Sequence, residues 1–257
     1  MFKEFKNLII INRLYSPMKL KSSLKRTYLI KKTRIFYNKM KIRAKQDRII
    51  QQSIEWRDLN RHNFTSVGNN GINDNAFPMD LVKVGKGTYG LLHVTSYGVG
   101  DEFLSIGDYC SIAQGVKFIL GGEHALDTIT TYPFERIYVD NESIETFSTK
   151  GKIIMENDVW IGSDALILSG VKLSQGTVVA AGSVVTKSSE PYSVIGGNPA
   201  KLIKKRFPEH IISQLLCINI SNLDTEFIKS NIDVLKLKVD DSTIDIINNR
   251  LADYINK

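Results

Sequence analysis

A six-residue repeat of apolar and polar positions runs through the middle of the chain. From Met155 the sequence divides into MENDVW, IGSDAL, ILSGVK, LSQGTV and VAAGSV, followed by VTK. The first position is always a large aliphatic residue: Met155, Ile161, Ile167, Leu173, Val179 and Val185. The fifth position is small or β-branched: Val159, Ala165, Val171, Thr177 and Ser183. The same pattern occurs earlier in VGKGTY, IGDYCS and IAQGVK, which begin at Val84, Ile106 and Ile112.

A period of six fits neither an α-helix nor a free β-strand, whose side chains repeat every 3.6 and 2 residues. Six residues make a short strand plus a turn, and three such units close a triangular coil of roughly 18 residues. Coils then stack at the strand spacing of ~4.8 Å, with the first and fifth positions pointing inward. Glycines such as Gly170 and Gly176 lie near the corners, where positive φ can be required. The pattern therefore predicts an all-β solenoid, a parallel β-helix with one continuous core.

Helical segments flank the predicted solenoid, and one loop interrupts it. Residues 1–60 lack glycine and show roughly helical apolar spacing, whereas residues 61–80 are predicted to form a loop. Residues 208–257 return to a helical pattern, in which Ser221 with Asp224 resembles a capping box. The repeat stops between Gly121 and about Lys152, which predicts an excursion loop, and loops of that length are usually functional. We expect an N-terminal extension (1–75), a β-helix domain (76–206) and a C-terminal helical segment (207–257).

The net charge of +7 is concentrated at the N-terminus. Residues 1–50 contain 15 Lys and Arg residues and only two acidic residues, so their net charge is +13 and that of the remainder is −6. Such an arm suits an anionic partner: a nucleic acid, an acidic polymer or a membrane leaflet. Because apolar residues alternate with the basic ones, we expect peripheral contact with an anionic membrane rather than binding of nucleic acid. The alternative is a helical cap that packs on the protein with its cations in water.

Signals for export or membrane spanning are weak. The longest apolar stretch near the N-terminus, Leu8–Ile11, is too short for a secretory signal, and no apolar run approaches the roughly 18 residues that span a bilayer. The two cysteines, Cys110 and Cys217, lie in no metal-binding pattern, so we expect two plain thiols in a reducing compartment. The chain is therefore expected to be cytoplasmic.

Several segments together resemble one family of enzymes. They are VGKGTYG (84–90), LSIGDYCSIAQGV (104–116), GGEHALDTITTYPF (121–134), KGKIIMENDVWIGSDALILSGV (150–171), VVAAGSVVTK (178–187) and YSVIGGNPAKLIKKRF (192–207). This set resembles the hexapeptide-repeat acyltransferases, and within them the xenobiotic acetyltransferase branch. That branch includes chloramphenicol and streptogramin acetyltransferases and many glycan O-acetyltransferases. The resemblance implies a left-handed coil, acetyl-CoA as the acetyl donor and a homotrimer.

His124 is the candidate catalytic residue. It stands in GGEH, where the regular repeat ends, and neutral imidazole can accept a hydroxyl proton and return it. The resemblance assigns it as the general base of a direct transfer in a ternary complex. The other histidines, His62, His93 and His210, lie outside such a context and are expected at the surface.

The resemblance also supplies residues for the two substrates. Residues that match CoA-lining positions are Trp160, Gly162, Ser163, Ala181, Thr186, Lys187, Lys201 and Lys204. Lys205 and Arg206 add positive charge beside the last two, and phosphates favour such charge-assisted donors. Tyr89 matches a tyrosine on the acceptor side, although a packed corner tyrosine is an equally good interpretation.

Together these features predict an O-acetyltransferase that acts on a sugar of a bacterial surface polysaccharide or its precursor. The arm 1–75, the segment WRDLNRHNFT (56–65) and the late helices favour a glycan acceptor, since compact drug acetyltransferases lack such an arm. The first alternative is a xenobiotic acetyltransferase of the chloramphenicol or streptogramin type. The second is a non-catalytic β-helix binding module. A zinc-dependent carbonic anhydrase on this fold needs three ligand histidines, so we expect no metal.

Overall fold

The computed structural model of the chain describes residues 22–67, 77–139 and 147–255. The chain forms two compact units, residues 1–48 and 49–257, and each is described here by itself. The first unit includes most of the long helix α2 (Ser22–Leu59). The residues before Ser22, which belong to the expected membrane contact, lie outside the described residues.

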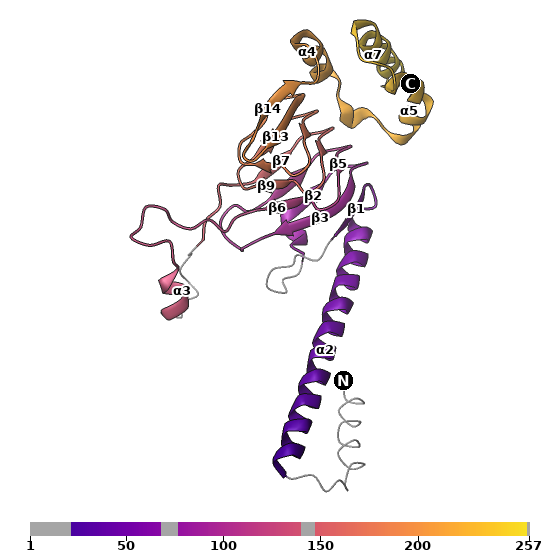
Figure 1. The fold of residues 1–257 in the computed structure, drawn as a ribbon. Helices are drawn as coiled ribbons and strands as arrows, with labels where there is room; N and C mark the ends of the chain where they lie inside the picture. The colour runs from indigo at the N-terminus through magenta and orange to yellow at the C-terminus, as the bar shows by residue number, and fades with distance from the viewer. Residues whose placement is uncertain (1–21, 68–76, 140–146, 256–257) are drawn as a thin grey trace. The chain divides into compact units, whose positions relative to one another are not determined.

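The second unit contains a parallel β-helix with three faces, whose strands stack in register (Figure 1). The first face contains β1 (Phe64–Val67), β3 (Tyr89–Thr95), β5 (Ser111–Ile112), β8 (Trp160–Ile161), β11 (Val178–Val179) and β13 (Ser193–Gly197). The second contains β2 (Val82–Val84), β4 (Leu104–Ile106), β7 (Ile153–Met155) and β10 (Lys172–Leu173). The third contains the end of β3, β6 (Lys117–Ile119), β9 (Leu166–Leu168) and β12 (Val184–Val185). Strand β14 (Ala200–Lys205) closes the first face and runs antiparallel to β13.

The interior of the coil confirms the repeat. Every first-position residue from Met155 to Val185 is at most 2% exposed, and so is every fifth-position residue from Val159 to Ser183. Burial of a large aliphatic side chain contributes about 1.5–3 kcal/mol, so this column is the main source of stability. The polar members Thr177 and Ser183 bond inside the coil, the latter donating its hydroxyl to the Ala180 carbonyl at 2.7 Å.

One corner of the coil is a column of residues with positive φ. Gly87, Tyr109, Asp158, Gly176 and Tyr192 all have φ between 51° and 72°. The Tyr192 ring covers Gly176 so closely that a Cβ there would lie 2.4 Å from it, and Tyr109 covers Gly87 in the same way. Glycine is therefore required at these two positions by both backbone conformation and space.

The end of α2 is joined to the first coil by a polar network. The Trp56 indole N–H donates to Thr65 Oγ1 at 3.0 Å, and Arg57 donates to the carbonyls of Thr65 and Asn60. Strand β1 pairs in parallel with β3, so the expected loop over residues 61–80 is wrong for 64–67. A short 3₁₀ turn, η1 (Met79–Leu81), precedes β2. The segment 56–65 thus serves to begin the solenoid.

The C-terminal segment consists of α4 (Glu209–Cys217), η2 (Ile220–Asn222), α5 (Thr225–Ser230), α6 (Ile232–Leu235) and α7 (Asp241–Ile255). Phe227, Val234, Ile247 and Leu251 form its own apolar core. The expected capping box is wrong in its first member: Asp224 caps α5 by accepting from the Phe227 N–H at 2.8 Å, and Ser221 lies in η2. Lys86 and Tyr109 of the coil donate to the carbonyls of Ser221 and Leu223, which ties the segment to the coil.

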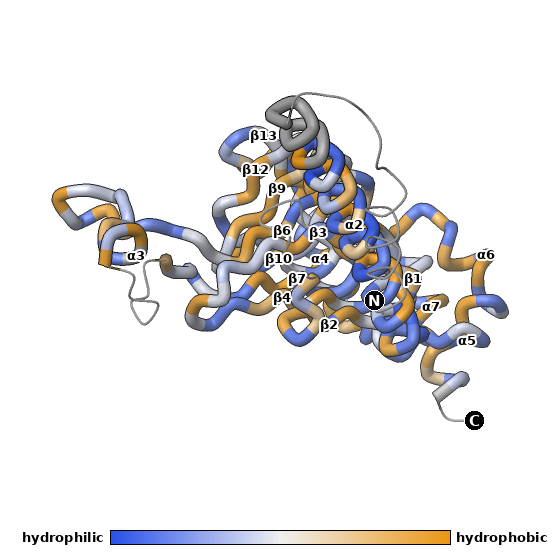
Figure 2. The backbone as a smooth tube through the Cα atoms, turned by 90° about the horizontal axis from the view of Figure 1, so that it is seen from below, coloured by the Kyte–Doolittle hydropathy of each residue, from blue (hydrophilic) through white to orange (hydrophobic). Residues whose placement is uncertain are grey.

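The excursion loop leaves the coil after β6 and returns at β7, as predicted, and it carries the short helix α3 (Phe134–Tyr138) (Figure 1). Helix α2 contains both hydrophilic and hydrophobic residues (Figure 2), and its apolar residues are not gathered on one face. None of the described helices is both long enough and apolar enough to cross a bilayer.

Candidate functional site

His124 lies at the base of the excursion loop, where the outgoing and returning segments pair. Glu123 and Ser148 form an antiparallel bridge, in which the Ser148 N–H donates to the Glu123 carbonyl at 2.9 Å. The Glu123 carboxylate accepts from the Ser169 hydroxyl at 2.8 Å and lies 3.4 Å from Lys150 Nζ. Since Ser169 and Lys150 belong to the coil and its edge, these bonds fix the base of the loop, and therefore His124, to the solenoid.

The hydrogen bond on His124 determines its tautomer. Nδ1 lies 2.6 Å from the carbonyl oxygen of Thr131, which can only accept, so Nδ1 carries the proton. Nε2 of the neutral ring then holds a lone pair and can accept a proton from a hydroxyl group. The ring also packs edge-on against Phe147, with ring centroids 5.0 Å apart. This arrangement suits a general base.

Three of the predicted acceptor and CoA residues, Tyr89, Trp160 and Lys204, share one row on the outer side of the first face. Tyr89 pairs with Ser111, which pairs with Trp160, and the row continues through Val178 and Val194 to Lys204. Tyr89 is 53% and Trp160 is 54% exposed, and Lys204 is also exposed. The structure therefore places two exposed aromatic side chains and one exposed cation, Tyr89, Trp160 and Lys204, in a single line.

The corner after β8 brings three further candidates together. A Cβ at Gly162 would lie 2.6 Å from the Ala181 nitrogen, so only glycine allows the two coils to stack here. The Ser163 carbonyl accepts from the Gly182 N–H at 2.8 Å, which leaves the exposed Ser163 side chain beside Ala181. Small residues at this corner leave room for a ligand close to the backbone.

The remaining candidates lie at two places. Thr186 and Lys187 are exposed directly after β12, on the third face. Lys201 is exposed on β14 and pairs with Gly196. Lys201 and Lys204 are therefore on the first face, whereas Lys187 is one corner away.

The expectation for Lys205 and Arg206 requires correction. Lys205 Nζ is 2.9 Å from the Glu190 carboxylate, and Arg206 Nη1 is 3.0 Å from that of Asp158. Arg206 also donates to the Gly176 carbonyl and lies over the Tyr192 ring. Both cations are thus engaged in holding the last coil together, which the run KLIKKR alone does not reveal.

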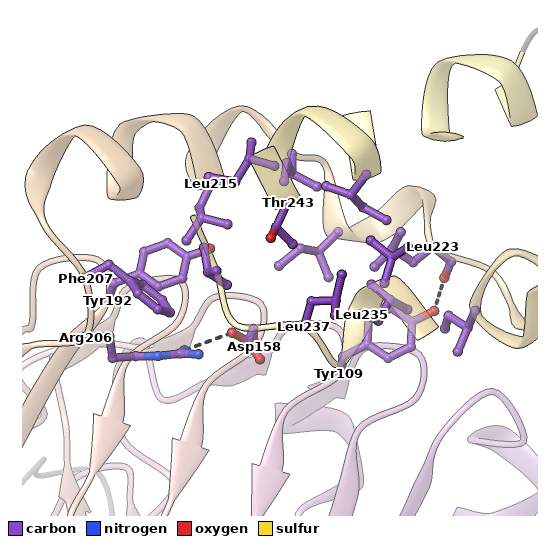
Figure 3. Close-up of a pocket in the computed structure, with 17 residues that line it drawn as sticks. Tyr109, Asp158, Tyr192, Arg206, Phe207, Leu215, Leu223, Leu235, Leu237 and Thr243 are labelled. Atoms are coloured by element: carbon purple, nitrogen blue, oxygen red, sulfur yellow. Dashed lines mark hydrogen bonds and ion pairs between the residues drawn. The ribbon is translucent and has the colours of Figure 1, made fainter. Parts of the chain in front are cut away.

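A cavity of about 390 Å³ lies between the corner column and the C-terminal helices (Figure 3). Most of its lining is aliphatic, including Leu215 and Leu237, and the Arg206–Asp158 pair lies at its polar end. None of the candidate residues lines it. Among the described residues no three His, Cys, Asp or Glu side chains gather as a metal site would require.

Sequence reasoning missed several parts of the site. The Thr131 carbonyl gives no signal because every residue carries one. Phe147, which touches the His124 ring, lies on the returning segment of the loop. The hexapeptide repeat is interrupted there and so does not predict which way its side chain points. Of the other histidines, His62 and His210 are exposed as expected, whereas His93 is partly buried in β3.

Curated relatives of this chain are acetyltransferases. It is 45% identical to a probable macrolide acetyltransferase of Lysinibacillus sphaericus over 142 residues, which are 53% of this chain and 78% of the relative. It is 41% identical to a chloramphenicol acetyltransferase of Klebsiella aerogenes, with 51% and 65% of the two chains covered. It is 42% identical to a virginiamycin A acetyltransferase of Staphylococcus aureus, with 52% and 63% covered. No family model matches the chain.

Solved structures are more distant. A maltose O-acetyltransferase from Clostridium difficile 630 is 23% identical, with 57% of this chain and 64% of that chain covered and a TM-score of 0.38. A hexapeptide-repeat acetyltransferase from Vibrio cholerae, complexed with acetyl coenzyme A, is 21% identical, with 65% and 90% covered and a TM-score of 0.42.

The fold is a left-handed parallel β-helix with helices at both ends. The chain belongs to the hexapeptide-repeat acetyltransferases, in the branch that contains the chloramphenicol and streptogramin enzymes.

Proposed function

We propose that this acetyltransferase moves the acetyl group of acetyl-CoA to a hydroxyl of a sugar in a bacterial surface polysaccharide or its precursor. The main support for this chemistry is the hydrogen bond between His124 Nδ1 and the Thr131 carbonyl, because it keeps the proton on Nδ1 and leaves the Nε2 lone pair available. General bases of this kind contribute about 10²–10⁴ to a rate.

In the proposed reaction, Nε2 of His124 takes the proton of the acceptor hydroxyl. The oxygen of that hydroxyl bonds at the same time to the carbonyl carbon of the thioester. A tetrahedral oxyanion forms, and fixed N–H donors are the groups that stabilise such a charge. The carbon–sulfur bond then breaks, and the imidazolium returns its proton to the sulfur of CoA. The products are the acetyl ester and free CoA, and the imidazole is again neutral.

The donor fits the exposed row on the first face. Trp160 offers an aromatic surface, the Gly162–Ser163 corner allows close approach, and Lys201 and Lys204 offer cations to phosphate groups. The row spans five strand steps from Tyr89 to Lys204, or roughly 24 Å at the usual ~4.8 Å spacing. That length suits an extended nucleotide-linked thioester.

The proposed assembly is a homotrimer. His124 stands on the loop after β6 of the third face, whereas the row of Tyr89, Trp160 and Lys204 lies on the first face. We place His124 of one subunit opposite the row of its neighbour. Light scattering tests this assembly, and an active, stable monomer at micromolar concentration would refute it.

The support for a glycan acceptor comes from the part of the chain outside the matched region. The relatives match 51–53% of this chain, so no single match can include both α2 and the C-terminal helices. Precursors of surface glycans are carried on lipids, and the basic residues 1–50 would approach the anionic leaflet that holds them.

An antibiotic is the second candidate acceptor. The specific observation in its favour is the identity of 41–45% to proteins named as chloramphenicol and macrolide acetyltransferases. The aligned regions cover 65–78% of those relatives' own length.

One assay separates the two acceptors. The full-length protein is incubated with radiolabelled acetyl-CoA and chloramphenicol, a streptogramin, a macrolide or a lipid-linked glycan extract, with His124→Ala as the control. We expect label in the glycan only, and mass spectrometry of surface glycans from cells with and without the gene should show the same acetyl group. Labelling of a drug alone would establish the second candidate, and no labelling with any acceptor would favour a binding module.

A further inference from the structure

The base of the excursion loop holds the catalytic ring with more than one contact. The N–H groups of Gly122 and Glu123 donate to the Ser148 carbonyl at 3.0 and 3.1 Å, so the two segments are aligned at this point. His124 directly follows Glu123, and Phe147 directly precedes Ser148. The pairing therefore brings the His124 and Phe147 rings together at 5.0 Å with an angle of 78° between their planes.

A single hydrogen bond does not fix an imidazole ring. The Thr131 carbonyl sets the direction of Nδ1, but the ring can still rotate about that bond. Terminal torsions between sp³ and sp² atoms, such as χ2 of histidine, are broad. The edge-on contact with Phe147 limits this rotation, and so it determines where the Nε2 lone pair points.

Phe147 is held by a second aromatic residue. The Tyr97 ring lies 5.8 Å from the Phe147 ring. Tyr97 also lies against Gly122, which has a φ of 93°, and a Cβ on this glycine would be 2.5 Å from the tyrosine ring. The three rings of Tyr97, Phe147 and His124 thus form a continuous contact that begins on the coil and ends at the base.

The position of Tyr97 is set by a buried carboxylate. Glu102 is only 5% exposed, and it accepts from the Tyr97 N–H at 3.0 Å, the Gly98 N–H at 3.1 Å and the Ser96 hydroxyl. A Cβ at Gly121 would lie 2.4 Å from Glu102 Oε1, so the same carboxylate touches the start of the loop. Buried carboxylates are stable where such donors satisfy them.

We propose that Phe147 is a positioning residue for His124, and that Tyr97 and Glu102 hold Phe147 in place. This inference rests on the proposed function, in which His124 is the base. Phe147 keeps the imidazole plane in the orientation that aims Nε2 at the acceptor hydroxyl. Displacement of a reacting group by about 1 Å can cost about 10²-fold in rate, so loss of the ring should reduce the rate and spare donor binding.

The test compares Phe147→Leu with Phe147→Tyr and with Tyr138→Leu. Leucine keeps apolar bulk but removes the ring, whereas tyrosine restores the ring. Tyr138 is an exposed aromatic of the same loop, and its ring packs against Tyr132 and Phe134. We expect kcat to fall about 10- to 100-fold in Phe147→Leu with the KM for acetyl-CoA within about twofold. Phe147→Tyr should recover most of the rate, and Tyr138→Leu should leave it within about twofold.

Nitrogen NMR of the imidazole gives a readout that needs no acceptor. The wild-type His124 ring should be the Nδ1–H tautomer, and Phe147→Leu should convert it to a mixture of both tautomers. Tyr97→Leu should give the same change in weaker form. If the wild type acetylates no acceptor, the proposed function fails, yet this spectrum still decides the role of Phe147.

Two results would overturn the inference. One is a Phe147→Leu variant with unchanged kcat and an unchanged His124 tautomer. The other is a parallel loss of kcat, donor affinity and Tm that Phe147→Tyr does not rescue, because such a pattern indicates a purely structural role.

Discussion

His124 Nδ1 and the Thr131 carbonyl oxygen lie 2.6 Å apart within one loop, seven residues from each other along the chain. The bond is local, so the tautomer of the proposed base is set by the loop of its own chain and not by a neighbouring subunit. Mutations in the coil that leave this loop intact should therefore preserve the base.

Replacement of His124 by alanine should abolish transfer while acetyl-CoA still binds. Loss of a general base costs about 10²–10⁴ in rate, whereas the residues proposed to bind the donor lie on the coil and not in the loop. Turnover and calorimetric titration with acetyl-CoA measure the two effects, and His210→Ala at an exposed position serves as the control. Near-normal turnover of the alanine variant, with contaminating enzyme excluded, would contradict the mechanism.

The double variant Lys201→Ala, Lys204→Ala should raise the KM for acetyl-CoA much more than the KM for dephospho-acetyl-CoA. Both side chains are exposed on β14, where they can donate to the 3′-phosphate. Steady-state kinetics with both donors measure the difference, and Lys83→Ala, an exposed lysine on the second face, is the matched control. An equal effect on the two donors would place these lysines away from that phosphate.

Shortening Ile167 to alanine should destabilise the coil by about 2–5 kcal/mol, because its side chain is fully buried and the cavity cannot collapse. The control is Ile154→Ala on the outer side of β7, where 39% of the residue is exposed. Urea unfolding at one protein concentration compares the two variants. Equal losses would mean that the interior column does not carry the stability.

The two cysteines should react very differently with a thiol reagent. Burial raises the pKa of Cys110 to about 12, and Cys217 is exposed. Because the raised pKa keeps the Cys110 thiol protonated at all pH values well below 12, the nucleophilic thiolate is absent at pH 8. We expect one rapid thiol equivalent per native chain and two after denaturation. Two rapid equivalents in the native protein would refute the burial of Cys110.

Residues 1–50 should bind anionic vesicles and be dispensable for chemistry. Each basic residue near such a surface contributes about 1 kcal/mol, and α2 also exposes apolar residues such as Ile35 and Phe36. Full-length protein should pellet with anionic vesicles in low salt, dissociate as salt rises and ignore neutral vesicles. A chain lacking residues 1–50 should stay in solution and still acetylate a soluble acceptor. An unfolded truncation, or an intact chain that never pellets, would show that the arm is a structural cap.

The solenoid was predictable because its signal repeats. Each hexapeptide needs an inward aliphatic residue and an inward small residue. A wrong register assigned to one hexapeptide would therefore disagree with the residues of the next. Strand β1 was not predictable in this way, because its four residues, Phe64–Val67, precede the first recognisable repeat and contain no second unit for comparison. Its pairing with β3 is a tertiary contact that local sequence does not encode.

The candidate site was predictable only where side-chain type determines chemistry. His124 stood out because imidazole is rare and the repeat broke beside it. Lys205 and Arg206 were misjudged because sequence reveals a charge but not its partner, and Glu190 and Asp158 lie 15 and 48 residues away. The contact between the Tyr97 and Phe147 rings depends on which segments of the loop pair with each other. The spacing of residues along the sequence does not predict that pairing.

The row from Tyr89 to Lys204 has one more consequence, since its members are separated by whole rungs of the coil. The distance between two residues of the row can change only in steps of ~4.8 Å, the spacing of adjacent strands. Gain or loss of one complete turn of the solenoid would move Lys204 by one strand spacing and leave the other residues of the row in register. A substrate of different length could thus be accommodated by changing the number of turns, with no redesign of any individual contact.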